Sequence, residues 1–193
     1  MTLQEAIEQT REKMVAKYPS WESLAPIERR LLVMAYLADE LKIREIGGNN
    51  RGKWVGILLE SVGLDEGYSW CAAALVFASM VAEAPRPKRP DYNPAAVIGW
   101  RQWAKAREAE RLGAFVDSPR RGDIAMKRTT ATSGHIAVVV RAWGIWCLTI
   151  EGNTSSGNSG SQSDGGSGGS NLPGGLYRRI RLRRWWSWGF ARV

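Results

Sequence analysis

One stretch of the chain joins a polar loop to an apolar helix through a cysteine. Residues 64–69 form a polar, glycine-containing segment, and an alanine-rich apolar run follows over residues 72–84. That run has the length and the helix propensity of a buried helix. We therefore expect Cys71 to lie at or near a helix N-terminus.

A cysteine in that position is placed to act as a nucleophile. The unpaired backbone N–H groups and the dipole of a helix N-terminus favour a thiolate over a thiol. The alternative is that Cys71 is a small buried hydrophobic residue, as free cysteines often are. Residues elsewhere in the chain distinguish these two interpretations, because a nucleophilic cysteine needs a partner that activates it.

The size and composition are those of one globular domain. The chain has 193 residues, of which 44% are hydrophobic and 24% are charged, enough for an ordinary core. The net charge of +8 indicates an anionic partner, unless the charge serves only solubility. Several of the ten tryptophans could form a surface platform for sugars or bases. The two cysteines could pair, but a cytosolic origin favours free thiols.

No feature of the sequence indicates a membrane or an export signal. No stretch reaches the roughly 18–20 apolar residues that span a bilayer. The first residues lack the basic and then apolar regions of a classical signal peptide. We therefore expect no transmembrane segment and no signal peptide.

The N-terminal part predicts two helices. Residues 2–5 have the pattern of a capping box, and Pro26 suits the first turn of a second helix. The second helix has an apolar stripe, which leaves Arg30 on the opposite, polar face. We divide the chain into a helical segment over residues 1–43, packed on the domain, and a domain over residues 44–193.

The C-terminal half changes to strand patterns. Residues 135–140 and 145–150 are apolar and rich in β-branched side chains, with a glycine turn between them. Residues 152–175 are almost entirely Gly, Ser and Asn, and we interpret them as a long loop inside the domain. Arginines alternate with apolar residues over 176–184, as in a half-exposed edge strand. The chain is thus expected to change from helices in its N-terminal half to strands in its C-terminal half.

The single histidine narrows the choice of chemistry. His135 begins a strand and follows the cysteine helix, the order that papain-like folds use. If the next strand pairs antiparallel, its far end brings Glu151 and Asn153 beside His135. Either side chain could then orient the imidazole. The simpler alternative for Glu151 is a solvated strand end.

The same residue count weakens several rival enzyme classes. Zinc hydrolases of bacterial walls generally need two or more histidines. The chain has no HExxH motif, no P-loop and no dinucleotide-binding glycine motif after a strand. A glycosidase with two carboxylates stays open, because acidic residues are available at Glu45, Glu60, Asp65 and Asp123.

Five short motifs, taken in order, resemble a CHAP domain. CHAP domains are cysteine, histidine-dependent amidohydrolases or peptidases of phage endolysins and bacterial wall hydrolases. The likeness covers roughly residues 41–193, and the ordered set is more specific than any one motif. The motifs lie at Glu45–Gly52, Ser69–Cys71, Gly122–Ala125, Ser133–Val139 and Ile150–Thr154.

The resemblance implies a fold and a set of roles. The fold would be papain-like α+β, with an antiparallel sheet packed on the nucleophile helix and with additional N-terminal helices. Cys71 would be the nucleophile, His135 the base and Glu151 the residue that orients His135. Asn153 would assist at the same end of the site.

We also predict substrate contacts at Asn50, Ser69 and Trp70. Some CHAP relatives bind calcium through an acidic loop before the cysteine. Here Asp65 and Glu66 form the only acidic pair near the cysteine. We therefore expect no metal and no cofactor.

The resemblance favours a peptidoglycan hydrolase. It would cut either the amide between muramic acid and L-alanine or a peptide bond of the stem or cross-bridge. We expect a monomeric phage lysin, made in the host cytoplasm and acting on the wall, with anionic wall polymers as further partners and no nucleic acid. The alternatives are a non-enzymatic, tryptophan-rich module that binds wall polymer or nucleic acid, and another thiol chemistry such as transglutamination.

Overall fold

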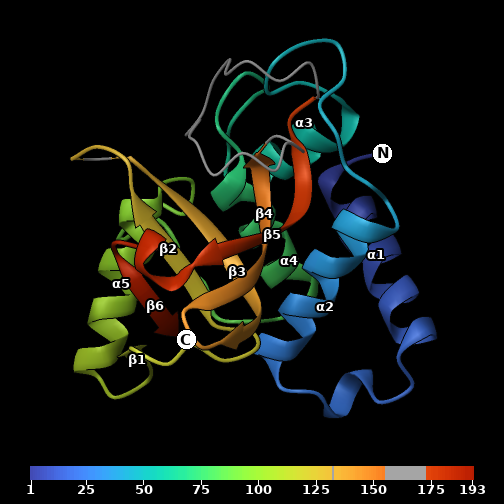
Figure 1. Ribbon diagram of the computed structural model, residues 1–193. Coiled ribbons are helices and arrows are strands. Elements are labelled where there is room, and N and C mark those ends of the chain that lie inside the picture. Colours follow the sequence, from blue (N-terminus) through green and yellow to red (C-terminus); the bar gives the residue numbers. More distant parts are fainter. Residues whose placement is uncertain (132, 155–172) are drawn as a thin grey trace.

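The computed structural model describes residues 1–131, 133–154 and 173–193. In these residues five α-helices precede a six-stranded antiparallel sheet, which confirms the predicted α+β class. Figure 1 shows α1 and α2 at one side of the molecule, α5 at the other, and α4 behind the sheet. None of the helices in these ranges combines the length and hydropathy needed to span a bilayer.

The first two helices begin where the sequence predicts. Helix α1 spans Leu3–Lys17, and its capping box is complete. The Thr2 hydroxyl accepts a hydrogen bond from the Glu5 amide (3.2 Å), and the Glu5 carboxylate accepts one from the Thr2 amide (2.8 Å). Helix α2 spans Pro26–Asp39, with Pro26 in its first turn. A short 3₁₀ helix, Trp21–Ser23, lies between the two.

The prediction of a polar position for Arg30 is wrong. Arg30 is fully buried, and its guanidinium donates to the carbonyls of Gly122 (3.1 Å) and Val193 (3.4 Å). Burial lowers the pKa of Arg30 to about 10, and the nearby Asp123 carboxylate opposes this effect. The guanidinium thus links α2 to the C-terminal end of the chain.

Helix α4, Cys71–Val81, is the most buried helix. All of its residues except Met80 are buried, and Cys71 is its first residue. Helix α3, Lys53–Glu60, precedes it, and α5, Val97–Ala109, follows it. The predicted N-terminal position of Cys71 is therefore confirmed.

The strands form one sheet in the order β1-β6-β2-β3-β4-β5, and every pair is antiparallel. β5 lies at one end of this order, as predicted for an edge strand. Most of the predicted loop over 152–175 lies outside the described residues. The strand bounds are β1 Ala114–Val116, β2 Ile124–Arg128, β3 Gly134–Trp143, β4 Trp146–Thr154, β5 Gly175–Leu182 and β6 Gly189–Arg192.

The two faces of the sheet carry different apolar clusters. Alternate strand residues such as Ile136, Val138 and Ile150 belong to the main core, which they share with α1, α2 and α4. The other face carries a smaller cluster made of Ala125, Ala137, Val139, Cys147, Trp186 and Phe190. Because side chains alternate along a strand, His135 and Glu151 lie on the face of the smaller cluster.

Candidate active site

Cys71 lies at the junction of a loop and a buried helix. It directly follows Trp70, the N-cap residue of α4, and its side chain is 7% exposed. Trp70 provides no side-chain cap to the helix in the described structure. The first backbone N–H groups of α4 therefore remain available to an anionic group beside the thiol.

His135 connects this thiol to a carboxylate. Its Nε2 atom lies 3.0 Å from Glu151 Oε2, and the Cys71 thiol is a hydrogen-bonding and electrostatic partner of the same ring. Because Glu151 occupies Nε2, Nδ1 is the nitrogen left to face Cys71. The structure thus brings together the three residues that the sequence predicts to act together.

The β3–β4 hairpin places His135 beside Glu151. Ala137 of β3 is paired with Glu151 of β4, and the two strands run antiparallel. His135 and Glu151 are therefore diagonal neighbours on one face of the sheet, within reach of each other's side chains. This is the strand pairing that the sequence predicts.

Glu151 is a fully partnered buried carboxylate, so the alternative of a solvated strand end is wrong. Its exposed fraction is 0%, and each of its oxygens accepts two hydrogen bonds. Oε2 accepts from His135 Nε2 (3.0 Å) and Arg181 Nη2 (2.8 Å). Oε1 accepts from Arg181 Nε (3.0 Å) and the Thr149 hydroxyl (2.7 Å).

These contacts favour the charged forms of both central groups. Burial acts to lower the pKa of His135, but hydrogen bonds with Cys71 and Glu151 outweigh it and raise this pKa to about 10. Burial likewise acts to raise the pKa of Glu151, but hydrogen bonds from His135 and Arg181 lower it to about 2. Near neutral pH the site therefore holds an imidazolium against a carboxylate.

Two tryptophans hold the imidazole plane. Trp186 stacks on His135 at an interplanar angle of 17°, with ring centroids 6.1 Å apart. Trp185 meets His135 edge-on at 6.0 Å. The Arg181 guanidinium lies 4.4 Å and the Lys127 ammonium 4.2 Å from the Trp185 ring centroid. The rotation of the His135 ring is thereby restricted from two sides.

The three predicted substrate contacts differ in their surroundings. Ser69 is exposed next to the cysteine, whereas Trp70 is fully buried and its indole donates to Glu45 (3.0 Å). The buried ring of Trp70 thus supports the loop that carries Glu45, and its contact with substrate stays a prediction. Asn50 is buried at a left-handed φ of 57°; its amide donates to Gly67 (3.3 Å), and its Oδ1 lacks a partner among the described residues.

Asn153 lies at an irregular point of β4. Its φ of 56° is left-handed, and the β4–β5 register shifts between Glu151 and Thr154. The Asn153 side chain forms no hydrogen bond within the part of the chain that the structure describes. Its assisting role therefore stays a prediction.

The sequence analysis missed Arg181 and Thr149. It placed the arginines of the edge strand outward, but Ile180 is 61% exposed while the Arg181 side chain is only 16% exposed. Alternation shows which residues share a face but not which face is buried. The prediction of Glu151 on the neighbouring strand could have indicated that Arg181 lies on the inner face, as a partner of that carboxylate.

Two of the four acidic residues considered for a two-carboxylate site, Glu45 and Asp123, have structural partners. Glu45 accepts from the Trp70 indole, and buried Asp123 accepts two hydrogen bonds from Arg192 (3.0 and 2.8 Å). Across residues 1–131, 133–154 and 173–193, no three His, Cys, Asp or Glu side chains gather as metal ligands would.

Comparison with known proteins identifies no relative of the chain. No family model, no curated protein and no solved structure matches it. Any assignment of function therefore depends on the resemblance of its motifs and on the geometry of Cys71, His135 and Glu151.

Proposed function

We propose that the protein is a cysteine amidase or endopeptidase that hydrolyses peptidoglycan, with a CHAP-like, papain-like arrangement of its site. One observation carries the proposal. A cysteine at the start of a buried helix interacts with a histidine that is itself bonded to a fully buried carboxylate. This is the nucleophile, base and orienting group that thiol-dependent acyl transfer requires.

The geometry supports a two-step mechanism. The Cys71 thiolate attacks the scissile carbonyl, and the first N–H groups of α4 stabilise the oxyanion. His135, as the imidazolium, donates its Nδ1 proton to the departing amine. The neutral ring then takes a proton from water, and the resulting hydroxide releases the acyl group from Cys71. Glu151 keeps the second proton on Nε2 and so maintains the orientation of the ring.

Arg181 completes the charge balance of this site. A thiolate, an imidazolium and the Glu151 carboxylate together carry one net negative charge in a poorly solvated place. The Arg181 guanidinium brings the sum to zero and holds both oxygens of the carboxylate. We assign Arg181 and Thr149 as positioning residues, because they act on the reaction through Glu151.

The buried charged residues of this site favour an enzyme over a module that only binds. Burying ionisable side chains is costly, and buried groups with shifted pKa values, such as His135 and Glu151, are typical of catalytic sites. A binding module gains nothing from a thiol paired with an imidazolium. Transglutamination would use the same residues, and its products distinguish it, because it joins two chains where hydrolysis creates a new carboxylate.

The origin and surroundings of the protein form part of the same proposal. A phage lysin made in the host cytoplasm would meet peptidoglycan after the membrane is breached. It would act there as a monomer, without a cofactor.

The test uses purified peptidoglycan sacculi. Wild-type protein should clear the suspension, and mass spectrometry of the soluble products should show one class of cleaved amide bond. Cys71→Ala should bind without clearing, while Cys147→Ala should clear normally. Full clearing by Cys71→Ala, or cross-linked instead of cleaved products, would overturn the proposal.

A further inference from the structure

Two adjoining hollows lie at the end of α4 that is remote from Cys71. Their volumes are about 460 and about 590 Å³, and both are lined by Met80, Arg86 and Lys88. Met80 lies nine residues after Cys71, which corresponds to about 14 Å along a helix axis. The hollows are therefore separate from the candidate active site.

The charged residues that line the hollows are mostly basic. Among the described residues, Glu83 is the only acid that lines either hollow, and its carboxylate forms ion pairs with Arg11 of α1 and Arg29 of α2. The charge of this acid is thus already compensated. The cations that line the larger hollow are Arg86, Lys88 and Arg107.

Two of these arginines have unmet hydrogen-bonding capacity. Arg86 is half-buried, has no hydrogen bond or ion pair in the described ranges, and its pKa is lowered by burial. Arg107 donates from Nη2 to the Leu112 carbonyl (3.1 Å), but its Nε is buried without a partner among the described residues. A guanidinium that loses water without gaining an acceptor is destabilised, so an entering anion would be favoured.

Two prolines restrict the backbone on either side of Arg86. Pro85 and Pro87 flank Arg86, and a proline ring fixes its own φ near −65°. The C-terminal dipole of α4 also attracts cations, but it corresponds to only about half a charge. It therefore cannot balance three cations, and an external anion is the remaining counterpart.

We propose that the two hollows form an accessory site for the phosphate groups of a base-free phosphodiester polymer. The planar guanidinium fork matches phosphate oxygens, and two hollows that share Arg86 and Lys88 in their lining can take successive phosphates of one chain. Trp103, the aromatic residue that lines the larger hollow, is 7% exposed and packs edge-on against Trp100. It thus offers no open face on which a nucleobase could stack.

The biological role of such a site rests on the proposed function. On a wall hydrolase it would hold the enzyme on phosphate-rich wall polymers while Cys71 works elsewhere. Binding itself does not require the chemistry of Cys71, so the two proposals can fail independently.

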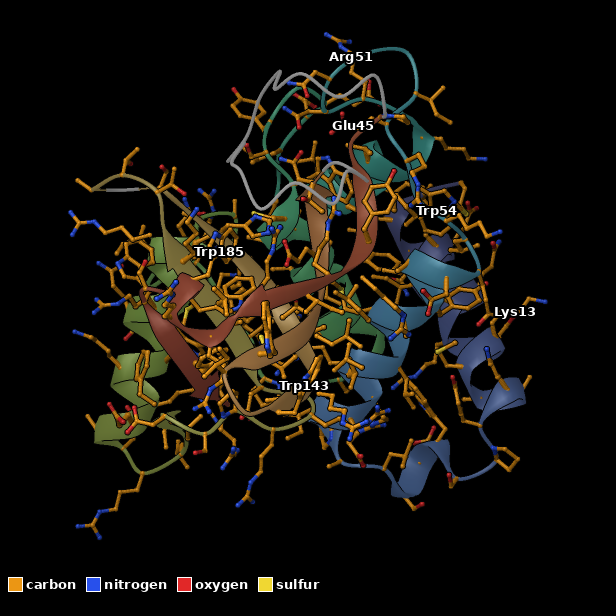
Figure 2. All side chains as sticks on the ribbon, viewed as in Figure 1. Lys13, Glu45, Arg51, Trp54, Trp143 and Trp185 are labelled. Atoms are coloured by element: carbon orange, nitrogen blue, oxygen red, sulfur yellow. The ribbon has the colours of Figure 1, made fainter. Side chains whose placement is uncertain are left out.

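The experiment measures binding by the full chain carrying Cys71→Ala, which prevents turnover. Poly(glycerol phosphate) and a single-stranded DNA of equal phosphate number are titrated separately by calorimetry at several salt concentrations. Adding Arg86→Gln and Lys88→Gln removes two cations that have no hydrogen-bond or ion-pair partner among the described residues. The matched control, Lys13→Gln with Lys105→Gln, removes two exposed charges, and Lys13 projects outward from α1 (Figure 2).

We expect Arg86→Gln/Lys88→Gln to weaken binding of poly(glycerol phosphate) by about tenfold or more and to reduce its salt dependence. The control pair should change binding by less than about twofold. An equal loss of affinity in the test pair and the control pair would mean that only net charge matters. If the protein does not bind poly(glycerol phosphate) at all, the proposed site is wrong. Tighter binding of DNA than of poly(glycerol phosphate) would overturn the choice of a base-free polymer.

Discussion

The two cysteines of this protein are both buried and both free, yet their surroundings are opposite. Cys71 starts α4 and faces the ring of His135. Cys147 lies within β4, in the apolar cluster with Trp186 and Phe190. Burial raises the pKa of the Cys147 thiol to about 11, which keeps it protonated and unreactive.

The difference between them is the availability of a cation. Arg181 stands opposite Cys147 in the β4–β5 register, but its guanidinium is committed to Glu151. Cys71, by contrast, has an imidazolium partner and the N-terminus of a helix. Both cysteines are buried, but these different surroundings make Cys71 a candidate nucleophile and Cys147 a packing residue.

The largest expected effect separates the two thiols by activity and labelling. Cys71→Ala should lower the rate of peptidoglycan cleavage on the order of 10⁴-fold or more, because no nucleophile remains. Cys147→Ala should keep the wild-type rate. Iodoacetamide at neutral pH should label Cys71 and spare Cys147, as followed by mass spectrometry. Preferential labelling of Cys147 in the folded protein would reverse the comparison.

The next effect compares two arginines of one strand. Arg181→Gln leaves the buried Glu151 with half of its hydrogen bonds, so kcat should fall about 10- to 100-fold with KM nearly unchanged. The acid limb of the pH–rate profile should move to higher pH, because the pKa of Glu151 is no longer held down by the guanidinium. Arg181→Lys should restore part of the rate.

Arg178 provides the matched control. It lies three residues earlier on β5 and pairs with Asp39 (2.6 Å) at an exposed position. Arg178→Gln should leave both the rate and the pH profile within about twofold of wild type. An equal loss of kcat in the two variants would mean that β5 matters only for stability.

Local patterns were sufficient to predict much of this site. The start of α4 follows from a polar loop that meets an alanine-rich run, and the β3–β4 hairpin follows from two apolar segments around Gly144. Together these elements bring Cys71, His135 and Glu151 near one another. Each element is encoded by residues that are close together in the sequence, which is why the sequence alone reveals it.

The missed features all depend on contacts between distant segments. Arg30 and Arg181 were both placed toward solvent, because charged residues on an amphipathic element usually lie outward. Arg30 instead points inward, where it donates to the carbonyls of Gly122 and Val193. Arg181 points inward to the carboxylate of Glu151. Periodicity contains no information about such partners. Short β6 escaped prediction for a related reason, since its four residues gain their pairing from β1 and β2.

The pH dependence of stability should report the buried ion pair. The pKa of His135 is raised from its ordinary 6.5 to about 10, so its stabilisation is complete below pH 6.5 and is lost as pH rises through about 10. The pKa of Glu151 is lowered from 4.5 to about 2, so its stabilisation is complete above pH 4.5 and is lost as pH falls through about 2.

These two directions place the largest contribution of the pair between pH 4.5 and 6.5. Glu151→Gln removes the carboxylate and should flatten the free energy of unfolding on both sides of this window. Urea titrations of both proteins across pH 3–9 provide the measurement. Parallel curves for wild type and Glu151→Gln would show that the pair is not ionised in the folded protein.

The smallest expected effect concerns the packing role of Cys147. Cys147→Ser places a hydroxyl in the apolar cluster beside Trp186. A buried hydroxyl costs about 1–3 kcal/mol of unfolding free energy when no hydrogen bond compensates it, and less if Trp186 Nε1, which has no partner among the described residues, donates to it. Cys147→Ala avoids the polar group and should cost less. Because Trp186 stacks on His135, the same variants test whether this cluster reaches the site. Urea unfolding should rank the stabilities as wild type, then Cys147→Ala, then Cys147→Ser, while kcat stays within about twofold. A larger fall in kcat in a stably folded Cys147→Ser would mean that Cys147 supports the imidazole of His135 through Trp186. Both cysteines would then contribute to catalysis, and they would differ only in the role that each plays.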